Sequence, residues 1–284
     1  MKDKIKELKI IATKLRMDII EMLAEAGSGH SGGSLSCADI LACLYFSVMR
    51  HNPKDPKWRE RDRFILSKGH ACPALYAALA EAGYFPREEI FTLRKLNSIL
   101  QGHPDMNKTP GVEFSSGSLG QGFAAAFGMA LGYKIDNNPG RIFVMLGDGE
   151  CQEGIVWETA MGVSHYKLDN LTAILDYNNL QIDGRVSEIM EIAPISEKFR
   201  SFGWTVYEID GHNIEEILWA LSPERIMPGK PTLIVARTIK GKGVSFMENQ
   251  VDWHGKAPSK EEAEIALKEL REELERLMRD GGSC

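Results

Sequence analysis

The sequence lacks the features that mark several classes of protein. Its five cysteines in 284 residues are odd in number and form no C-x-x-C pair, which disfavours a disulfide framework or a zinc site. No apolar run approaches the ~20 residues that span a membrane, and the first residues lack the apolar core of a signal peptide. With 34 basic and 40 acidic residues the net charge is −6, and nucleic-acid binding usually needs a basic face. We therefore expect a cytoplasmic protein with reduced, buried thiols that binds neither nucleic acid nor membrane.

The composition is that of an ordinary globular protein. The chain is 43% hydrophobic and 26% charged, and its length allows one large α/β domain or two smaller ones. A chain of this size can bury roughly three quarters of its unfolded surface, so its core needs no metal or disulfide. Because no repeat or linker divides the chain, we predict a single domain over residues 1–284, ending in an arm and a charged helix at about 241–284.

Apolar segments alternate with helical patterns along most of the chain. Strands that are apolar on both faces indicate an α/β fold with a mostly parallel sheet covered by helices on each side. The predicted strands are 63–67, 141–146, 171–176, 204–209 and 231–236. The predicted helices are 3–25, 36–49, 73–82, 119–133, 153–166, 213–221 and 259–280, with a glycine-rich turn at 27–33.

The clearest chemical signal lies where two of these strands end. Gly147-Asp148-Gly149 closes one strand, and Asn178 follows after 28 further residues at the end of the next. Ligands of parallel sheets bind at the carboxyl ends of strands. A carboxylate, a carboxamide oxygen and a nearby backbone carbonyl suit Mg²⁺, which commonly shares its ligands with phosphates. The glycines and the helix beginning near 153 favour a bound diphosphate, whereas Gly-Asp-Gly alone is usually a plain turn.

Four of the seven histidines lie in loops flanked by glycine or proline: His30, His70, His103 and His254. The ordinary pKa of histidine, ~6.5, suits proton transfer near neutral pH. One such histidine would be interpreted as a loop or core residue, but four in separate motifs favour a catalytic role. The other three, His51, His165 and His212, lie outside these segments, and we expect no functional role for them.

The pattern GDG-x28-NN resembles the diphosphate-binding motif of thiamine-diphosphate enzymes, and GDGECQEGIVWE and LDYNNLQIDG resemble transketolase. Four further segments agree in content and order: SGHSGG (28–33), LSKGH (66–70), GHPD…SSGSLGQG (102–122) and VDWHGKAP (251–258). The resemblance runs from about residue 10 to about residue 258, nearly the whole chain.

The resemblance implies thiamine diphosphate and Mg²⁺, or another divalent cation, as cofactors. Asp148, Asn178 and the carbonyl of Leu180 would hold the cation. His30, His70, His103 and His254 would line the catalytic cleft. The cofactor-binding residues it implies are His70, Gly117, Leu119, Gly147, Asp148, Gly149, Glu150, Glu153, Glu158, Asn178 and His254, with Glu153 and Glu158 near a subunit interface.

The sequence departs from the common family pattern at three positions. Ser31 and Ser118 stand where proline is common, and Lys68 stands where asparagine is frequent. These changes do not affect the histidines and glycines of the motifs. They therefore bear on the substrate preference more than on the identity of the cofactor.

The resemblance covers only the diphosphate-binding module of the family. The second module, which binds the aminopyrimidine and carries the activating glutamate, cannot fit in the ~45 residues after Ile239. The resemblance therefore implies the N-terminal subunit of a two-chain transketolase of the pentose phosphate pathway. With a C-terminal subunit in an α2β2 heterotetramer, it would move a two-carbon ketol group from a ketose phosphate, of the xylulose 5-phosphate type, to an aldose phosphate.

Three alternatives stay open at this point. The chain could serve a ketolase for a modified or sulfonated ketose, because of the departures near His30 and Gly117. It could be a binding module for thiamine diphosphate without turnover. It could also be a truncated piece of a full-length transketolase.

Overall fold

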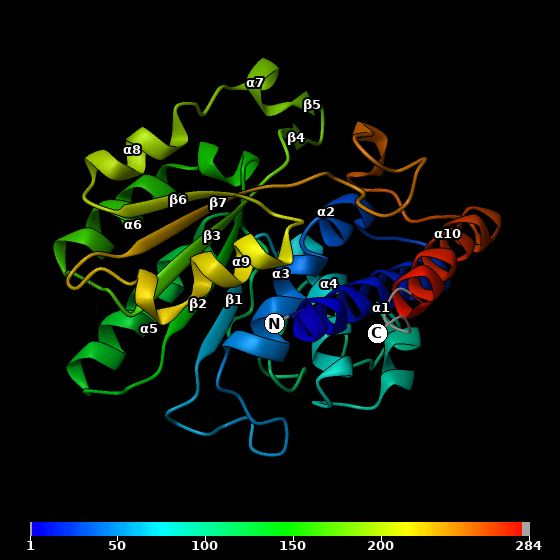
Figure 1. Cartoon of the computed structure of the whole chain (residues 1–284), viewed down its shortest axis with the longest axis horizontal. Coiled ribbons are helices and arrows are strands. Elements are labelled where there is room, and N and C mark those ends of the chain that lie inside the picture. Colours follow the sequence, from blue (N-terminus) through cyan, green and yellow to red (C-terminus); the bar gives the residue numbers. More distant parts are fainter. Residues whose placement is uncertain (1, 280–284) are drawn as a thin grey trace.

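A five-stranded parallel sheet forms the centre of the computed structural model, which describes residues 2–279 (Figure 1). The strand order is β1-β2-β3-β7-β6, and every neighbouring pair is parallel. The strands are β1 Arg63–Leu66, β2 Ile142–Gly147, β3 Leu171–Tyr177, β6 Thr205–Asp210 and β7 Thr232–Arg237. All five predicted strands are confirmed, each to within one residue, and so is the α/β fold.

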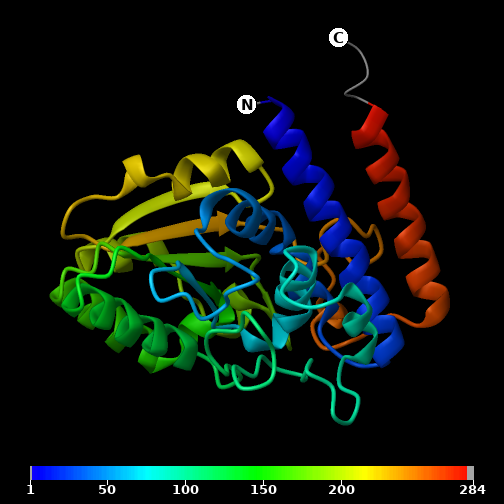
Figure 2. The same ribbon diagram turned by 90° about the horizontal axis from the view of Figure 1, so that it is seen from below.

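The sheet is covered on both faces, which explains its apolar strands. Along β2, Phe143 and Met145 pack into one hydrophobic cluster, whereas Val144 and Leu146 pack into the other. Figure 2 shows the sheet between its two helical layers. One layer contains α1 Lys2–Ala26, α3 Ala38–Cys43, α4 Cys72–Glu81 and α9 Ile214–Leu221; the other contains α5 Gln121–Ile135, α6 Gly154–His165 and α8 Ile195–Ser201.

The glycine-rich segment after α1 differs from the prediction. The turn ends at His30, and a short buried helix, α2 Ser31–Leu35, follows it. The predicted helix 36–49 is divided into α3 and the π-helical turn η1 Leu44–Val48. A Cβ on Gly32 would come within 2.8 Å of Lys240 Cγ, so this glycine serves close packing inside a helix. Glycine content alone could not distinguish that role from a turn.

The segment Ser31–Val48 is apolar and long enough to cross a membrane by composition, with a mean hydropathy of 1.3. In the fold, 83% of it is buried inside the molecule. Buried core helices share the composition of membrane spans, and this segment lies in the core between α1 and the sheet.

The predicted charged helix at the C-terminal end is α10 Lys260–Arg279. It lies alongside α1 (Figure 2) and buries Ala263, Ala266 and Leu270. The residues after it, including Cys284, lie outside the described part of the chain. The other four cysteines, Cys37, Cys43, Cys72 and Cys151, are free and buried, as predicted.

Several short elements were not predicted because they are too short to show a periodicity. A hairpin of β4 Leu180–Gln181 and β5 Gly184–Arg185 is followed by α7 Val186–Ile189. The 3-10 turns are η2 Gly69–Ala71, η3 Arg87–Thr92, η4 Gly149–Gln152, η5 Pro223–Arg225 and η6 Val251–Trp253. The hairpin matters for function because Leu180 and Gln181 line the cleft described next.

Candidate active site

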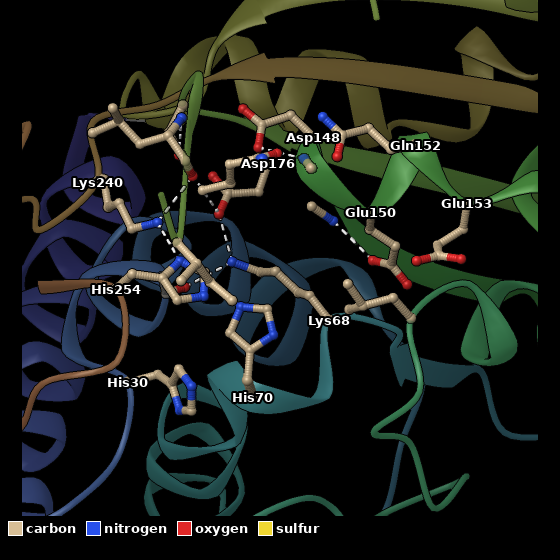
Figure 3. A pocket seen from close by; sticks show the side chains of 18 of the residues that line it. His30, Lys68, His70, Asp148, Glu150, Gln152, Glu153, Asp176, Lys240 and His254 are labelled. Carbon is tan, nitrogen blue, oxygen red and sulfur yellow. Dashed lines mark hydrogen bonds and ion pairs between the residues drawn. The ribbon is translucent and has the colours of Figure 1, made fainter. Parts of the chain in front are cut away.

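A cleft of about 330 Å³ opens where the carboxyl ends of the central strands meet (Figure 3). Lys68 and His70 follow β1, Asp148 follows β2, Asn178 follows β3 and Lys240 follows β7. Because the strands are parallel, their carboxyl ends share one edge, and residues far apart in sequence face one cavity.

The three predicted metal ligands lie together in this cleft. Asp148 Oδ1 accepts a hydrogen bond from the Gly149 N–H at 2.8 Å, and its Oδ2 accepts one from the Asn179 N–H. Asn178 Oδ1 accepts one from the Leu180 N–H at 3.1 Å. Burial raises the pKa of Asp148 to about 6, and the neighbouring carboxylate of Asp176 adds to this. Because its burial outweighs the nearby charge of Lys240, this carboxylate would be stabilised by a divalent cation beside it.

The donor set also fits a cation shared with a phosphate ligand. Within residues 2–279 there is no group of three or more histidine, cysteine, aspartate or glutamate side chains that could hold a metal by themselves. The site offers one carboxylate, one carboxamide oxygen and one carbonyl, so a hexacoordinate Mg²⁺ would take its remaining ligands from water or phosphate.

Glu150 lines the cleft and also forms hydrogen bonds within the protein. Its Oε1 accepts hydrogen bonds from the Ser67 hydroxyl and from the Gly120 N–H at 2.7 Å, and its Oε2 accepts one from the Gly147 N–H at 3.0 Å. Burial raises the pKa of Glu150. Its carboxylate lines the cleft but ties together the ends of β1 and β2 and the start of α5. Its contact with a cofactor stays a prediction.

Three of the four predicted histidines form a cluster on the opposite wall. The ring centroids of His30, His70 and His254 lie 5.1 to 5.6 Å apart. Burial lowers the pKa of His30 to about 4 and that of His254 to about 3, and it holds the pKa of His70 well below its usual value. All three rings are therefore neutral near pH 7. His30 Nδ1 is buried without a hydrogen-bond partner, which fits a polar ligand group beside it.

His103 stands apart from that cluster. Its side chain is exposed and does not line the cleft, although a Cβ on Gly117 would lie 3.6 Å from its ring. Partial shielding of the ring from solvent, with help from the cation of Arg94, lowers the pKa of His103. Its catalytic role therefore stays a prediction that needs a ligand reaching beyond the cleft.

The remaining predicted residues are divided between the cleft and the surface. Gly117, Leu119 and Gly149 line the cleft, as does the exposed Glu153 at its rim. Glu158 lies on the exposed face of α6 and contributes nothing to the lining.

The sequence reasoning missed two lysines in the cleft (Figure 3). Lys68 Nζ lies 2.5 Å from Asp176 Oδ2 and donates to the Gly33 carbonyl at 2.7 Å. Burial opposes both charges, but their mutual attraction outweighs it, so the pKa of Asp176 is lowered and that of Lys68 is raised. Lys68 was noticed only as a departure from a family pattern.

Lys240 connects the two walls of the cleft. Its Nζ donates to the Leu180 carbonyl at 2.9 Å and lies 2.7 Å from His254 Nδ1. Burial lowers its pKa to about 8, so it carries its charge at neutral pH and faces any anion that enters. No motif in the sequence marked this position, because its role depends on contacts with segments far away in the chain.

Fold and site together define an α/β domain with a polar cleft at the carboxyl ends of its parallel strands, where a buried carboxylate and a lysine face neutral histidines. The family model described as "Transketolase, thiamine diphosphate binding domain" matches residues 7–274. The chain belongs to this family.

Similar proteins include chains that are named as transketolase subunits. The chain is 46% identical over 267 residues to the 6-deoxy-6-sulfo-D-fructose transketolase subunit SqwG of Clostridium sp. (strain MSTE9), covering 94% of this chain and 97% of that one. It is 41% identical over 276 residues to an apulose-4-phosphate transketolase subunit of Phocaeicola vulgatus, covering 97% of this chain and 98% of that one.

The chain matches less than half of transketolases that are single long chains. The structure of transketolase from Campylobacter jejuni superposes with a TM-score of 0.87 at 35% identity, covering 94% of this chain and 42% of that one. Both kinds of match agree with the prediction of an N-terminal transketolase subunit.

Proposed function

We propose that this chain is the subunit of a two-chain transketolase that holds the diphosphate and metal end of thiamine diphosphate. The observation that carries the proposal is the cleft in which Asp148, Asn178 and the Leu180 carbonyl face three neutral histidines across Lys240. In this proposal Mg²⁺ is the cation, and the backbone at Gly147 and Gly149 lies against the diphosphate.

When bound, thiamine diphosphate supplies a nucleophilic carbon that can accept a two-carbon ketol group and release it to an aldehyde. The chain's own residues supply binding and proton transfer. Lys240 places a positive charge near the diphosphate, and the Asp148 carboxylate holds the cation. His30, His70 and His254, neutral at pH 7, can accept or donate a proton at sugar hydroxyl groups.

The pyrimidine half of the cofactor and the substrate's anionic end would be bound by a separate C-terminal subunit, in an α2β2 assembly. Support comes from relatives that are named as subunits and that this chain covers almost completely. The first test is to combine the chain with thiamine diphosphate, Mg²⁺, xylulose 5-phosphate and ribose 5-phosphate, with and without the partner. Ketol transfer should require both chains, and full activity of this chain alone would refute the proposal.

The second candidate is the same chemistry on a modified ketose, which the 46% identical relative named for 6-deoxy-6-sulfo-D-fructose favours. Comparing kcat/KM of the reconstituted enzyme for xylulose 5-phosphate, a sulfonated ketose and apulose 4-phosphate decides between the two. A preference of a hundredfold corresponds to about 2.7 kcal/mol in transition-state binding.

A binding module without turnover is disfavoured by the histidine cluster, because holding a diphosphate needs no such group. Replacing His30 by alanine tests this. Turnover should fall while cofactor affinity is largely kept, and unchanged turnover would favour the binding module.

A further inference from the structure

His212, for which the sequence indicated no role, belongs to a hydrogen-bond network. This network connects Arg16 of α1 to the backbone of Ile239, the residue before Lys240. Arg16 of α1 forms two hydrogen bonds to Asp39 of α3, Nη1 to Oδ1 at 3.2 Å and Nη2 to Oδ2 at 2.5 Å. His212, in the turn between β6 and α9, places its Nδ1 2.7 Å from Asp39 Oδ2. Its Nε2 accepts a hydrogen bond from the Ile239 N–H at 2.8 Å.

These contacts define the tautomer of His212. The Ile239 N–H is a donor, so Nε2 must be unprotonated, and the proton of the neutral ring must then sit on Nδ1. Nδ1 can donate that proton only to the Asp39 carboxylate, which the Arg16 guanidinium holds in place. Asp39 thus orients the ring, and the ring accepts from the backbone one residue before Lys240.

The segment after β7 is fastened at further points. The Gly211 N–H donates to the Arg237 carbonyl at 2.8 Å, and a Cβ on Gly211 would lie only 2.5 Å from Thr238 Cγ2. The Thr238 hydroxyl donates to Asp176 Oδ1. The β6–α9 turn is therefore pressed against the segment from which the Lys240 side chain enters the cleft.

We propose that His212 and Asp39 are positioning residues for Lys240. They hold the backbone at Ile239 so that Lys240 Nζ lies between the Leu180 carbonyl and His254 Nδ1. The consequence for thiamine diphosphate rests on the function proposed above, whereas the consequence for the position of Lys240 does not.

Two substitutions of His212 separate its two hydrogen bonds. In His212→Asn the amide nitrogen takes the place of Nδ1, so the bond to Asp39 is kept and the bond from Ile239 is lost. In His212→Gln the amide oxygen takes the place of Nε2, so the bond from Ile239 is kept. His51→Asn is the matched control, because His51 also bridges two groups, Tyr84 Oη at 3.1 Å and the Tyr45 carbonyl at 2.7 Å, without lining the cleft.

The affinity of the full chain with its partner for thiamine diphosphate, titrated calorimetrically with Mg²⁺ present, is the first measurement. We expect His212→Asn to weaken it by ~10-fold or more, as changes behind a ligand-contacting residue commonly do, and His212→Gln to stay within about threefold of the wild type. Thermal unfolding is measured in parallel. Equal affinities in wild type and His212→Asn, or an equal loss in His51→Asn, would overturn the proposal in favour of a purely structural network.

The position of Lys240 is the second measurement and needs no cofactor. Lysines of the chain are ¹³C-methylated, and the Lys240 signal is assigned by its absence in Lys240→Arg. Its chemical shift should move in His212→Asn and stay in His212→Gln, and an unmoved signal in His212→Asn would refute the positioning role. If the wild type binds no thiamine diphosphate, the function proposed above fails, while this measurement still tests the role of His212.

Should His212→Asn fail to fold, Asp39→Ala replaces it. This change removes the acceptor of the Nδ1 proton, so the ring loses the contact that orients Nε2 toward the Ile239 N–H. The same movement of the Lys240 signal is then expected, and its absence would equally refute the role.

Discussion

At the scale of single residues, two buried aspartates at neighbouring strand ends have different roles in the cleft. Asp148 has a raised pKa because burial penalises its charge and only backbone N–H groups donate to its carboxylate. Asp176 instead has a lowered pKa because Lys68 faces it. The first carboxylate is therefore suited to a cation ligand, and the second is already part of an ion pair.

Replacing Asp148 by asparagine should abolish the Mg²⁺ dependence of thiamine diphosphate binding and keep the fold. The carboxylate contacts turn N–H groups and no core residue, so its loss removes the cation ligand without opening a cavity. Calorimetry with and without Mg²⁺ measures the first effect and thermal unfolding the second. Asp183→Asn, at an exposed acidic residue that also lines the cleft, should bind like the wild type. Unchanged affinity in Asp148→Asn would contradict the assignment.

Replacing Lys68 by methionine should destabilise the chain by about 3–5 kcal/mol, because it leaves the Asp176 carboxylate buried and unpaired. Both side chains are almost fully buried, with 2% and 1% exposed. The double variant Lys68→Met with Asp176→Asn should recover much of that loss. Urea unfolding of the wild type, both single variants and the double variant measures the coupling. Additive losses would show that the pair is not coupled.

At the scale of elements, the layer containing α1, α3 and α9 is joined through buried polar groups as well as apolar packing. Arg16 of α1, Asp39 of α3 and His212 before α9 meet between these helices. Burial alone would raise the pKa of Asp39, but the Arg16 guanidinium and His212 outweigh it and hold that pKa well below its usual value. The network therefore makes the packing of this layer depend on pH.

Lowering the pH should reduce the free energy of unfolding of the wild type more than that of Asp39→Asn. A carboxyl whose pKa is depressed in the folded state stabilises the fold above its unfolded pKa of ~3.9 and loses that contribution as the pH falls further. Asp39→Asn lacks this titration. Its free energy of unfolding should therefore be lower at pH 7 and should fall less between pH 5 and pH 3 than that of the wild type. The free energy of unfolding in urea at each pH measures both curves. Parallel curves would exclude Asp39 as a source of acid sensitivity.

At the scale of the whole molecule, the cleft is bordered by apolar side chains that the chain itself leaves uncovered. The hairpin β4–β5 and α7 project from the body near the cleft (Figure 1). There Ile182 is 67% exposed, Ile189 48% and Met190 56%. Exposed apolar groups clustered beside a ligand site are typical of an interface, and the proposed partner subunit would cover them.

Ile182→Ser should weaken association with the partner subunit while leaving the fold of this chain unchanged. Ile182 lies at the turn of the hairpin, so its replacement opens no cavity. Association is measured by calorimetry or analytical ultracentrifugation. Ile265→Ser is the control, because Ile265 is 54% exposed on α10, which contributes no residue to the cleft lining. Equal association of wild type and Ile182→Ser would place the interface elsewhere.

The sequence by itself determined the five strands, the helical layers and the turn at Asp148. Each of these is recorded within one segment: an apolar run that must be buried on both faces, or small and polar residues that end a strand. It also pointed to His30, His70 and His254, whose neighbours in sequence carry the family resemblance.

Only the tertiary structure decided how distant segments meet. The glycines at 32 and 33 proved to lie in a helix, where Gly32 leaves room for the Lys240 side chain, and Glu150 proved to accept hydrogen bonds from Ser67 and Gly120. Lys240, Asp39 and His212 became visible for the same reason. Their partners lie far away in the chain, and hydrogen bonds between such segments depend on the packed fold, which no local pattern records.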